Sequence, residues 1–142
     1  MCLRVWCVGN ALMGDDGVGC RVAELLRDAS VAVTDCGVAP ENHLGELRHM
    51  KGTLLIVDAV DMGLEPGETR IMTLDDVGAG VVETSHGVPL SALLAPFRDS
   101  MEMLVLGIQP GQRELGRAPS PAVERAAVRV SESIIRGDWR RS

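Results

Sequence analysis

The chain has 142 residues, of which 46% are hydrophobic, and a formal net charge of −6 at pH 7. This length suits one domain with a buried core, and we expect a single domain over residues 1–142. The acidic charge argues against nucleic-acid binding, and no apolar run approaches the length of a membrane span, so we expect a cytoplasmic protein without membrane insertion.

The most informative stretch is the glycine-rich segment 9–19, which joins a predicted strand at 5–8 to a helix. Such loops often bind phosphate, but Asp15 and Asp16 stand where a Walker A motif has lysine and a hydroxyl residue. The Rossmann glycine pattern fails as well, because Val22 follows where a packing glycine is needed. Two carboxylates would repel a pyrophosphate and attract a cation, so we interpret the segment as a metal-facing loop.

Strands and helices alternate through the next part of the chain. We expect a second strand at 31–35, a helix opened by Pro40 and a third strand at 53–58. The third strand is apolar without alternation, which is typical of a central parallel strand covered on both faces. This alternation of elements predicts a parallel α/β sheet.

The second half of the chain adds further elements to this sheet. They are, in order, a short strand at 69–72, a loop at 75–87, a helix from Pro89, a buried strand at 103–108 and a helix from Pro121. We expect the short strand to be an antiparallel edge, Ser120 to be the N-cap of the last helix and Gly137 to end it. Residues 138–142 are expected to be frayed.

The four cysteines, Cys2, Cys7, Cys20 and Cys36, form no Cys-x-x-Cys motif. Two of them fall inside a predicted strand and a predicted helix. We therefore expect reduced and mostly buried thiols without a catalytic role.

Acidic residues follow the predicted strands at the edge of the sheet where ligands bind in open α/β folds. Asp16 follows the first strand, Asp35 ends the second, Asp58 ends the third, and His86 lies in a later loop. Two carboxylates and an imidazole would suit a borderline divalent ion, with open positions for water or substrate. Asp58 is the strongest candidate, because a carboxylate directly after an apolar strand is costly to bury without a partner.

Other acidic and histidine residues carry weaker signals. We expect four aspartates to be solvated or to cap helices: Asp15, Asp61, Asp75 and Asp76. His43, Glu46 and His49 form a rival cluster, but the two histidines would lie about 9 Å apart along a helix, so one ion could not easily meet both. We interpret that cluster as a solvated helix edge. Gly-x-Ser-x-Gly and His-Glu-x-x-His motifs are absent.

Five segments, taken in order, resemble the hydrogenase maturation endopeptidases, most closely the branch serving hydrogenase 3 of the formate hydrogenlyase system. They are residues 8–19, 39–42, 54–63 with 66–68, 84–90 and 106–110. The resemblance implies a three-layer α/β/α sandwich around a mostly parallel five-stranded sheet with one antiparallel edge strand. Residues 112–142 match the family in kind and not in detail, so we expect little functional information there.

The resemblance also implies a function. The chain would be an atypical, nickel-dependent aspartic-type endopeptidase that removes the C-terminal extension of a [NiFe]-hydrogenase large-subunit precursor after nickel insertion. Asp16, Asp58 and His86 would contact the nickel and carry the catalysis. The nickel would be presented by the substrate, although another divalent ion could occupy the site in isolation. We expect the protein to act as a monomer with that precursor as its partner.

Several alternatives stay open from the sequence. Many family members carry glutamate in the first loop, so the shorter Asp16 could bind the ion directly or through water. The nickel could polarise the scissile carbonyl or its attacking water, or it could serve recognition alone while a carboxylate such as Asp35 acts as general base. A metal-binding chaperone that inspects the large subunit without cutting it would keep the same ligands. A phosphate or nucleotide enzyme is contradicted by Asp15 and Asp16.

Overall fold

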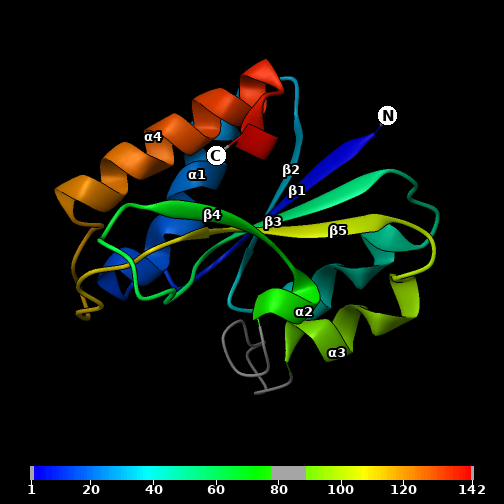
Figure 1. Cartoon of the computed structure of the whole chain (residues 1–142), viewed down its shortest axis with the longest axis horizontal. Coiled ribbons are helices and arrows are strands. Elements are labelled where there is room, and N and C mark those ends of the chain that lie inside the picture. The colour runs from blue at the N-terminus through cyan, green and yellow to red at the C-terminus, as the bar shows by residue number, and fades with distance from the viewer. Residues whose placement is uncertain (1, 78–88, 142) are drawn as a thin grey trace.

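The computed structural model describes residues 2–77 and 89–141, which form a five-stranded sheet flanked by helices (Figure 1). The strands are β1 (Leu3–Val8), β2 (Ala32–Gly37), β3 (Thr53–Ala59), β4 (Thr69–Thr73) and β5 (Glu102–Ile108). The α-helices are α1 (Val18–Leu26), α2 (Leu74–Val77), α3 (Leu90–Leu94) and α4 (Pro121–Arg136). The short 3-10 helices are η1 (Gly14–Gly17), η2 (Pro40–Leu47), η3 (Ala95–Phe97) and η4 (Trp139–Arg141).

The strand order is β2-β1-β3-β5-β4, with β4 antiparallel to β5 and the other pairs parallel. The predicted mostly parallel sheet with one antiparallel edge is therefore confirmed. After β1, the chain forms β2 on one side of β1 and then crosses over to form β3 on the other side of β1. Strand order thus reverses between β1 and β3, and open α/β sheets bind ligands at the carboxyl ends of the strands beside such a point.

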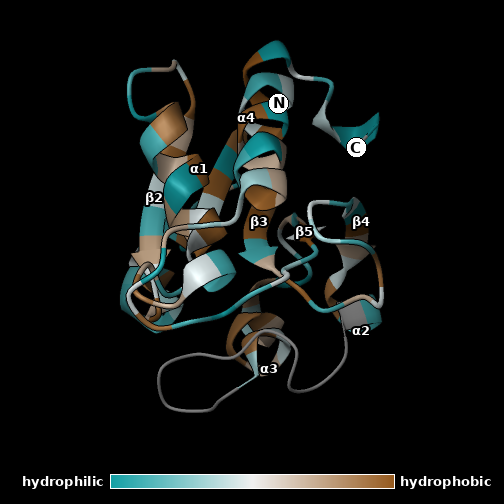
Figure 2. Ribbon diagram, turned by 90° about the vertical axis from the view of Figure 1, so that its left-hand side faces the viewer, coloured by the Kyte–Doolittle hydropathy of each residue, from teal (hydrophilic) through white to brown (hydrophobic). Residues whose placement is uncertain are grey.

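Side chains alternate across the sheet and fill two separate cores. In β1, Val5 and Cys7 pack in the core that contains α1 and α4, while Trp6 and Val8 pack in the core that contains η2 and α3. Figure 2 shows the sheet end-on, with α1 and α4 on one side, α3 on the other and the hydrophobic β3 between them. The three-layer arrangement expected from the sequence is confirmed.

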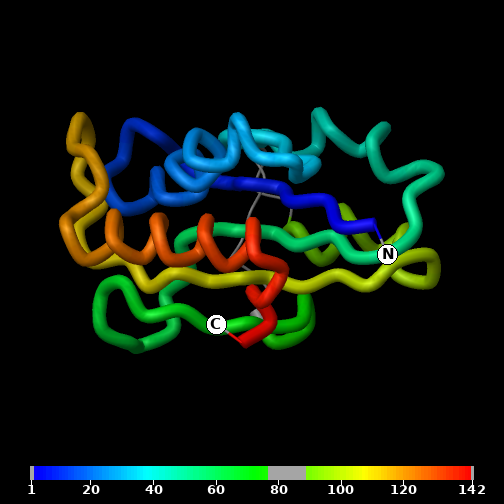
Figure 3. The backbone as a smooth tube through the Cα atoms, turned by 90° about the horizontal axis from the view of Figure 1, so that it is seen from above, coloured from blue at the N-terminus to red at the C-terminus, as the bar shows by residue number. Residues whose placement is uncertain are grey.

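Helices α1 and α4 run side by side over their face of the sheet (Figure 3). They are joined by an ion pair in which Arg21 Nε donates to both carboxylate oxygens of Glu124, at 2.9 and 3.0 Å. Gly19 allows α1 to approach the strands, because a β-carbon there would lie 2.1 Å from the carbonyl oxygen of Val8. Gly19 therefore fixes how closely α1 begins above β1.

The helix expected from Pro40 is present as the 3-10 helix η2, whose Asn42 and Gly45 have low α-helix propensity. Two expectations about local structure were wrong. Residues 75–77, expected to be loop, belong to the short helix α2. The tail is not frayed up to residue 141: Gly137 ends α4 with φ +86°, and Trp139, 5% exposed, packs into the core beneath α1 and α4. No helix within residues 2–77 and 89–141 has the length and apolar content that crossing a membrane requires.

Candidate functional site

The glycine-rich loop closes over the ends of β1 and β3. The backbone nitrogen of Asn10 donates to the carbonyl oxygen of Asp16 at 2.9 Å, which folds the loop back on itself. A β-carbon added to Gly9 would lie 2.3 Å from that same carbonyl oxygen and 3.8 Å from Oδ1 of Asp58. Only glycine permits this approach, so the loop brings Asp16 to the carboxyl ends of β1 and β3, which we call the β1–β3 edge, and Asp58 is the penultimate residue of β3.

Asp58 is a buried carboxyl group, with 8% of the residue exposed. Its Oδ1 accepts a hydrogen bond from the backbone nitrogen of Ala59 at 2.8 Å. Burial raises the pKa of Asp58 well above its usual value; the Ala59 hydrogen bond opposes this, the charge of Asp16 raises it further and Arg113 lowers it. Asp58 therefore holds a proton more readily than an ordinary aspartate.

Asp16 is half-buried and forms an ion pair with Arg113, whose Nε lies 2.9 Å from Oδ1 of Asp16. Burial raises the pKa of Asp16, Arg113 opposes that change, and the neighbouring Asp15 adds to it. Arg113 belongs to the loop between β5 and α4, in the segment 112–142 where the sequence predicted little functional information. Its position just after the carboxyl end of β5 was the available signal, because the same rule selected the aspartates.

Asp15 was expected to be solvated or capping, and this was wrong because it is fully buried. Its carboxylate accepts hydrogen bonds from the backbone nitrogen of Gly111 at 2.7 Å, and from the backbone nitrogen and hydroxyl of Ser120 at 2.6 and 3.0 Å. Ser120 occupies the N-cap position of α4 as expected, but its hydroxyl bonds Asp15 and not the helix. Asp15 therefore fastens the β5–α4 loop to the glycine-rich loop.

Gln109 fastens the loop after β3 in a similar way. Its buried side chain accepts from the backbone nitrogens of Met62 and Leu64 at 2.7 and 3.2 Å, and donates to Asp61 at 3.2 Å. That hydrogen bond, followed by one from Gly63, lowers the pKa of Asp61, which is exposed as expected. The loops after β3 and β5 are thus tied together on the side of the sheet that carries Asp58.

Two of the three predicted site residues, Asp16 and Asp58, come together at the β1–β3 edge. His86 lies outside the described residues. Within residues 2–77 and 89–141, no three histidine, cysteine or acidic side chains are placed to hold a metal ion. Two neighbouring carboxyl groups offer oxygen ligands that suit a divalent ion which takes its remaining ligands from elsewhere.

Asp35 lies apart from this pair. Cys7 of β1 pairs with Asp35 on one side and with Val57 of β3 on the other, so β1 separates Asp35 from Asp58. Asp35 is exposed and accepts from the backbone nitrogen of Gly37 at 3.2 Å. It lines a cavity of about 450 Å³ that includes Cys20. The structure therefore does not place Asp35 beside the two carboxylates.

The cysteines have the expected character. All four are free, with Cys2 exposed and Cys7, Cys20 and Cys36 buried. Burial, followed by nearby charges, raises the pKa of Cys20 and that of Cys36 to about 12. Such thiols stay protonated at neutral pH and are poor nucleophiles.

Glu46, the centre of the rival cluster, has a structural role. It was interpreted as part of a solvated edge, but its half-buried Oε1 accepts from Arg4, Trp6 and Thr34 at 3.1, 3.1 and 2.7 Å. Only one histidine joins it, as expected: His43 Nδ1 lies 3.3 Å from its Oε2. Burial raises the pKa of Glu46, but the hydrogen bonds and Arg4 outweigh it and lower that pKa overall. Glu46 thus joins η2 to β1 and β2.

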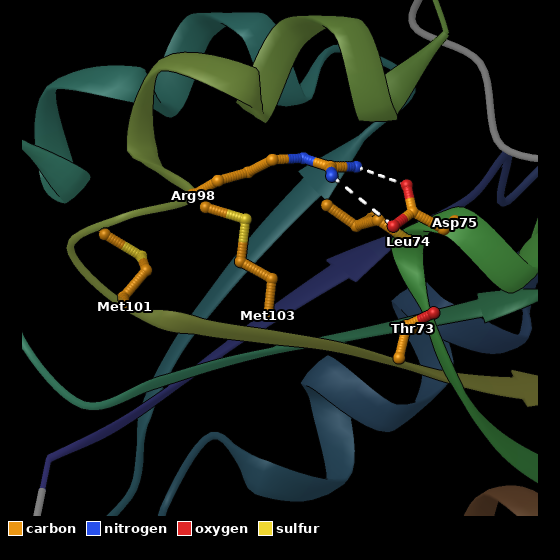
Figure 4. A pocket seen from close by; sticks show the side chains of 6 residues that line it. All are labelled: Thr73, Leu74, Asp75, Arg98, Met101 and Met103. Atoms are coloured by element: carbon orange, nitrogen blue, oxygen red, sulfur yellow. Dashed lines mark hydrogen bonds and ion pairs between the residues drawn. The ribbon is translucent and has the colours of Figure 1, made fainter.

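A small cavity of about 190 Å³ lies at the opposite edge of the sheet, near the amino end of β5 (Figure 4). It is lined by Thr73, Leu74, Asp75, Arg98, Met101 and Met103. The ion pair between Arg98 Nη2 and Asp75 Oδ1, at 2.7 Å, spans it. Asp58 lies near the carboxyl end of β3, opposite Gly107 near the carboxyl end of the parallel strand β5. The cavity lies at the amino end of β5, so it is separate from the candidate site.

The sequence and the structure of the chain were compared with those of known proteins, and both resemble hydrogenase maturation proteases. A family model described as HycI, hydrogenase maturation protease, matches residues 20–137. The hydrogenase 3 maturation protease of Escherichia coli (strain K12) is 46% identical over 109 residues, covering 73% of this chain and 70% of that protein. The solution structure of an endopeptidase HycI from Escherichia coli superposes with a TM-score of 0.84 at 38% identity, covering 96% of this chain and 90% of that one. The crystal structure of a [NiFe] hydrogenase maturation protease HycI from Thermococcus kodakarensis KOD1 gives a TM-score of 0.83 at 28% identity, covering 96% and 92%.

Proposed function

The chain belongs to the hydrogenase maturation protease family, and from this membership we propose that it removes the C-terminal extension of a [NiFe]-hydrogenase large-subunit precursor after nickel insertion. The nickel arrives as part of the substrate. Asp16, Asp58 and His86 recognise it. The observation that carries this proposal is the meeting of Asp16 and Asp58 at the β1–β3 edge. His86 joins the site through the family resemblance alone.

The chemistry assigned to the chain's own residues follows from the two carboxyl groups. Nickel held by the substrate would polarise the scissile carbonyl or the attacking water. Burial raises the pKa of Asp58 above its usual value, so its carboxylate would accept a proton from that water more readily than an ordinary aspartate would. Asp16 would help Asp58 to orient the ion. Asp35 is less suited to the role of base, because β1 lies between it and Asp58.

The face around the carboxylates also suits contact with a large partner. Leu12 and Leu115 are 66% and 75% exposed; Leu115 pairs with Met13 in an isolated antiparallel bridge, and Leu12 directly precedes Met13. We define Leu12 and Leu115 as the apolar rim. Exposed apolar side chains beside a polar site are typical of protein-interaction surfaces. The apolar rim would therefore contact the precursor around its metal centre.

The proposal includes a monomeric protein acting in the cytoplasm. Its direct test is to incubate the protein with nickel-loaded precursor and to follow the precursor's intact mass. We expect a shortened chain with wild-type protein and with Asp35→Asn, and at least a hundredfold slower shortening with Asp16→Asn or Asp58→Asn, by analogy with the loss of metal ligands at catalytic sites. Binding of the precursor without any shortening would favour the chaperone alternative.

A further inference from the structure

Arg113 is a cation that faces several carboxylates at the candidate site. Arg113 Nε lies 2.9 Å from Asp16 Oδ1, and its positive charge also lowers the pKa of Asp58 and of Asp61. Its side chain is 45% exposed, so the guanidinium can leave the pair for water without breaking the core. The guanidinium of Arg113 and a metal ion would therefore compete for the carboxylate of Asp16.

The backbone around Arg113 is held independently of this ion pair. On one side, the nitrogen of Asp15 donates to the carbonyl oxygen of Gln112 at 2.9 Å. On the other side, the nitrogen of Gly116 donates to the carbonyl oxygen of Leu12 at 2.7 Å. The loop is thus fixed against the glycine-rich loop at both ends, and the guanidinium is presented to Asp16 by the fold.

We propose that Arg113 determines specificity by occupying the cation position at Asp16, so that the carboxylate pair binds free divalent ions weakly and favours an ion presented by a protein. The inference rests on the proposed function of Asp16 and Asp58. Binding of a divalent cation must displace the guanidinium or bear its repulsion, which weakens the binding of dissolved metal. A precursor adds the contact area of a protein interface, and this can offset the displacement of Arg113. The apolar rim beside Arg113 would supply part of that contact.

Nearby Arg117 provides a matched control. It lies in the same loop, its side chain is 65% exposed, and it pairs with Glu114 at 2.6 Å, with no ion pair to Asp16 or Asp58. Replacing Arg117 changes the net charge of the protein by the same amount as replacing Arg113. A difference between the two variants therefore reports the position of the charge and not its sum.

The test is the binding of Ni²⁺ to the isolated full chain, measured by isothermal titration calorimetry at low ionic strength. We expect Arg113→Gln to bind Ni²⁺ about tenfold more tightly than wild type, within the usual range for coupled sites. Arg113→Lys, which keeps the charge, and Arg117→Gln should stay near wild type. The gain in Arg113→Gln should shrink as salt is added, because the site is partly exposed.

Two further variants separate this inference from the proposed function. Asp58→Asn and the double variant Arg113→Gln/Asp58→Asn should both lose Ni²⁺ binding. If Asp58→Asn loses binding while Arg113→Gln binds no more tightly than wild type, the role of Arg113 is overturned and the carboxylate site stands. If Asp58→Asn binds like wild type, the carboxylate site itself fails. Circular dichroism and thermal melting show that each variant is folded before titration.

Discussion

The carboxylate of Asp15 accepts hydrogen bonds from both the backbone nitrogen and the hydroxyl of Ser120, which lies 105 residues further along the chain. Asp16, the next residue, turns toward Arg113 and the β1–β3 edge. Two adjacent carboxylates thus have different tasks. Asp15 holds the β5–α4 loop against the glycine-rich loop, and Asp16 faces the candidate site.

The first prediction concerns stability. Asp15→Ala leaves the buried donors of Gly111 and Ser120 without their acceptor, so the free energy of unfolding should fall by about 2–4 kcal/mol. Urea denaturation followed by circular dichroism measures this loss. Asp99→Ala, an exposed aspartate, is the control and should change stability by less than about 0.5 kcal/mol. Equal effects of the two substitutions would show that Asp15 does not hold the loop.

The second prediction concerns pH. Because the pKa of Asp58 is raised in the folded protein, the folded state holds this proton more tightly than the unfolded state. The stability that the protonated Asp58 contributes is complete below the usual aspartate pKa. It is lost as pH rises through the pKa of Asp58 in the folded protein. Asp58→Asn removes this dependence. The variant should therefore gain stability relative to wild type as pH rises from about 4 toward neutrality, by at most about 1.4 kcal/mol per pH unit.

This second prediction is measured as the difference in unfolding free energy between the two proteins at a series of pH values. Taking the difference cancels the titration of carboxylates that do not interact with Asp58, such as Glu46, whose pKa is lowered. A difference that stays constant over this range, or that favours wild type at neutral pH, would show that Asp58 is not held in a site that favours its protonated form.

The third prediction concerns the apolar rim. Replacing both Leu12 and Leu115 with serine removes exposed apolar contacts without touching the carboxylates, so KM for the precursor should rise several-fold while kcat stays unchanged. Ile135→Ser is the control, because Ile135 is 54% exposed on α4, outside the loops that carry the site. Steady-state cleavage of nickel-loaded precursor gives both constants. A fall in kcat with constant KM would assign the apolar rim a role in the chemical step.

Much of the fold could be predicted because the local signals are strong. The apolar run at β3 and the glycine after α4 mark elements that the structure contains. The 3-10 conformation of η2 and the ordered tail could not be predicted in this way. Glu46 of η2 is held by hydrogen bonds from β1 and β2, which lie far from it in the sequence, and Trp139 is ordered by a core built from distant residues.

The candidate site was partly predictable for similar reasons. The rule that ligands bind at the carboxyl ends of strands selected Asp16 and Asp58, and the structure brings them to one edge. The burial of Asp15 was not predicted, because its hydrogen-bond partners come from a loop about one hundred residues away. Arg113 was missed because the sequence-based choice considered only carboxylates and histidines after the strands, and its contact with Asp16 follows from the packing of the β5–α4 loop.

The central claim is that nickel in the precursor is what Asp16 and Asp58 recognise. The most direct measurement is to incubate wild-type protein with nickel-loaded and with nickel-free large-subunit precursor, and to compare their intact masses over time. The account predicts that only the nickel-loaded precursor loses its C-terminal extension and that Asp58→Asn leaves both forms uncut. Equal shortening of the loaded and nickel-free precursors would contradict it.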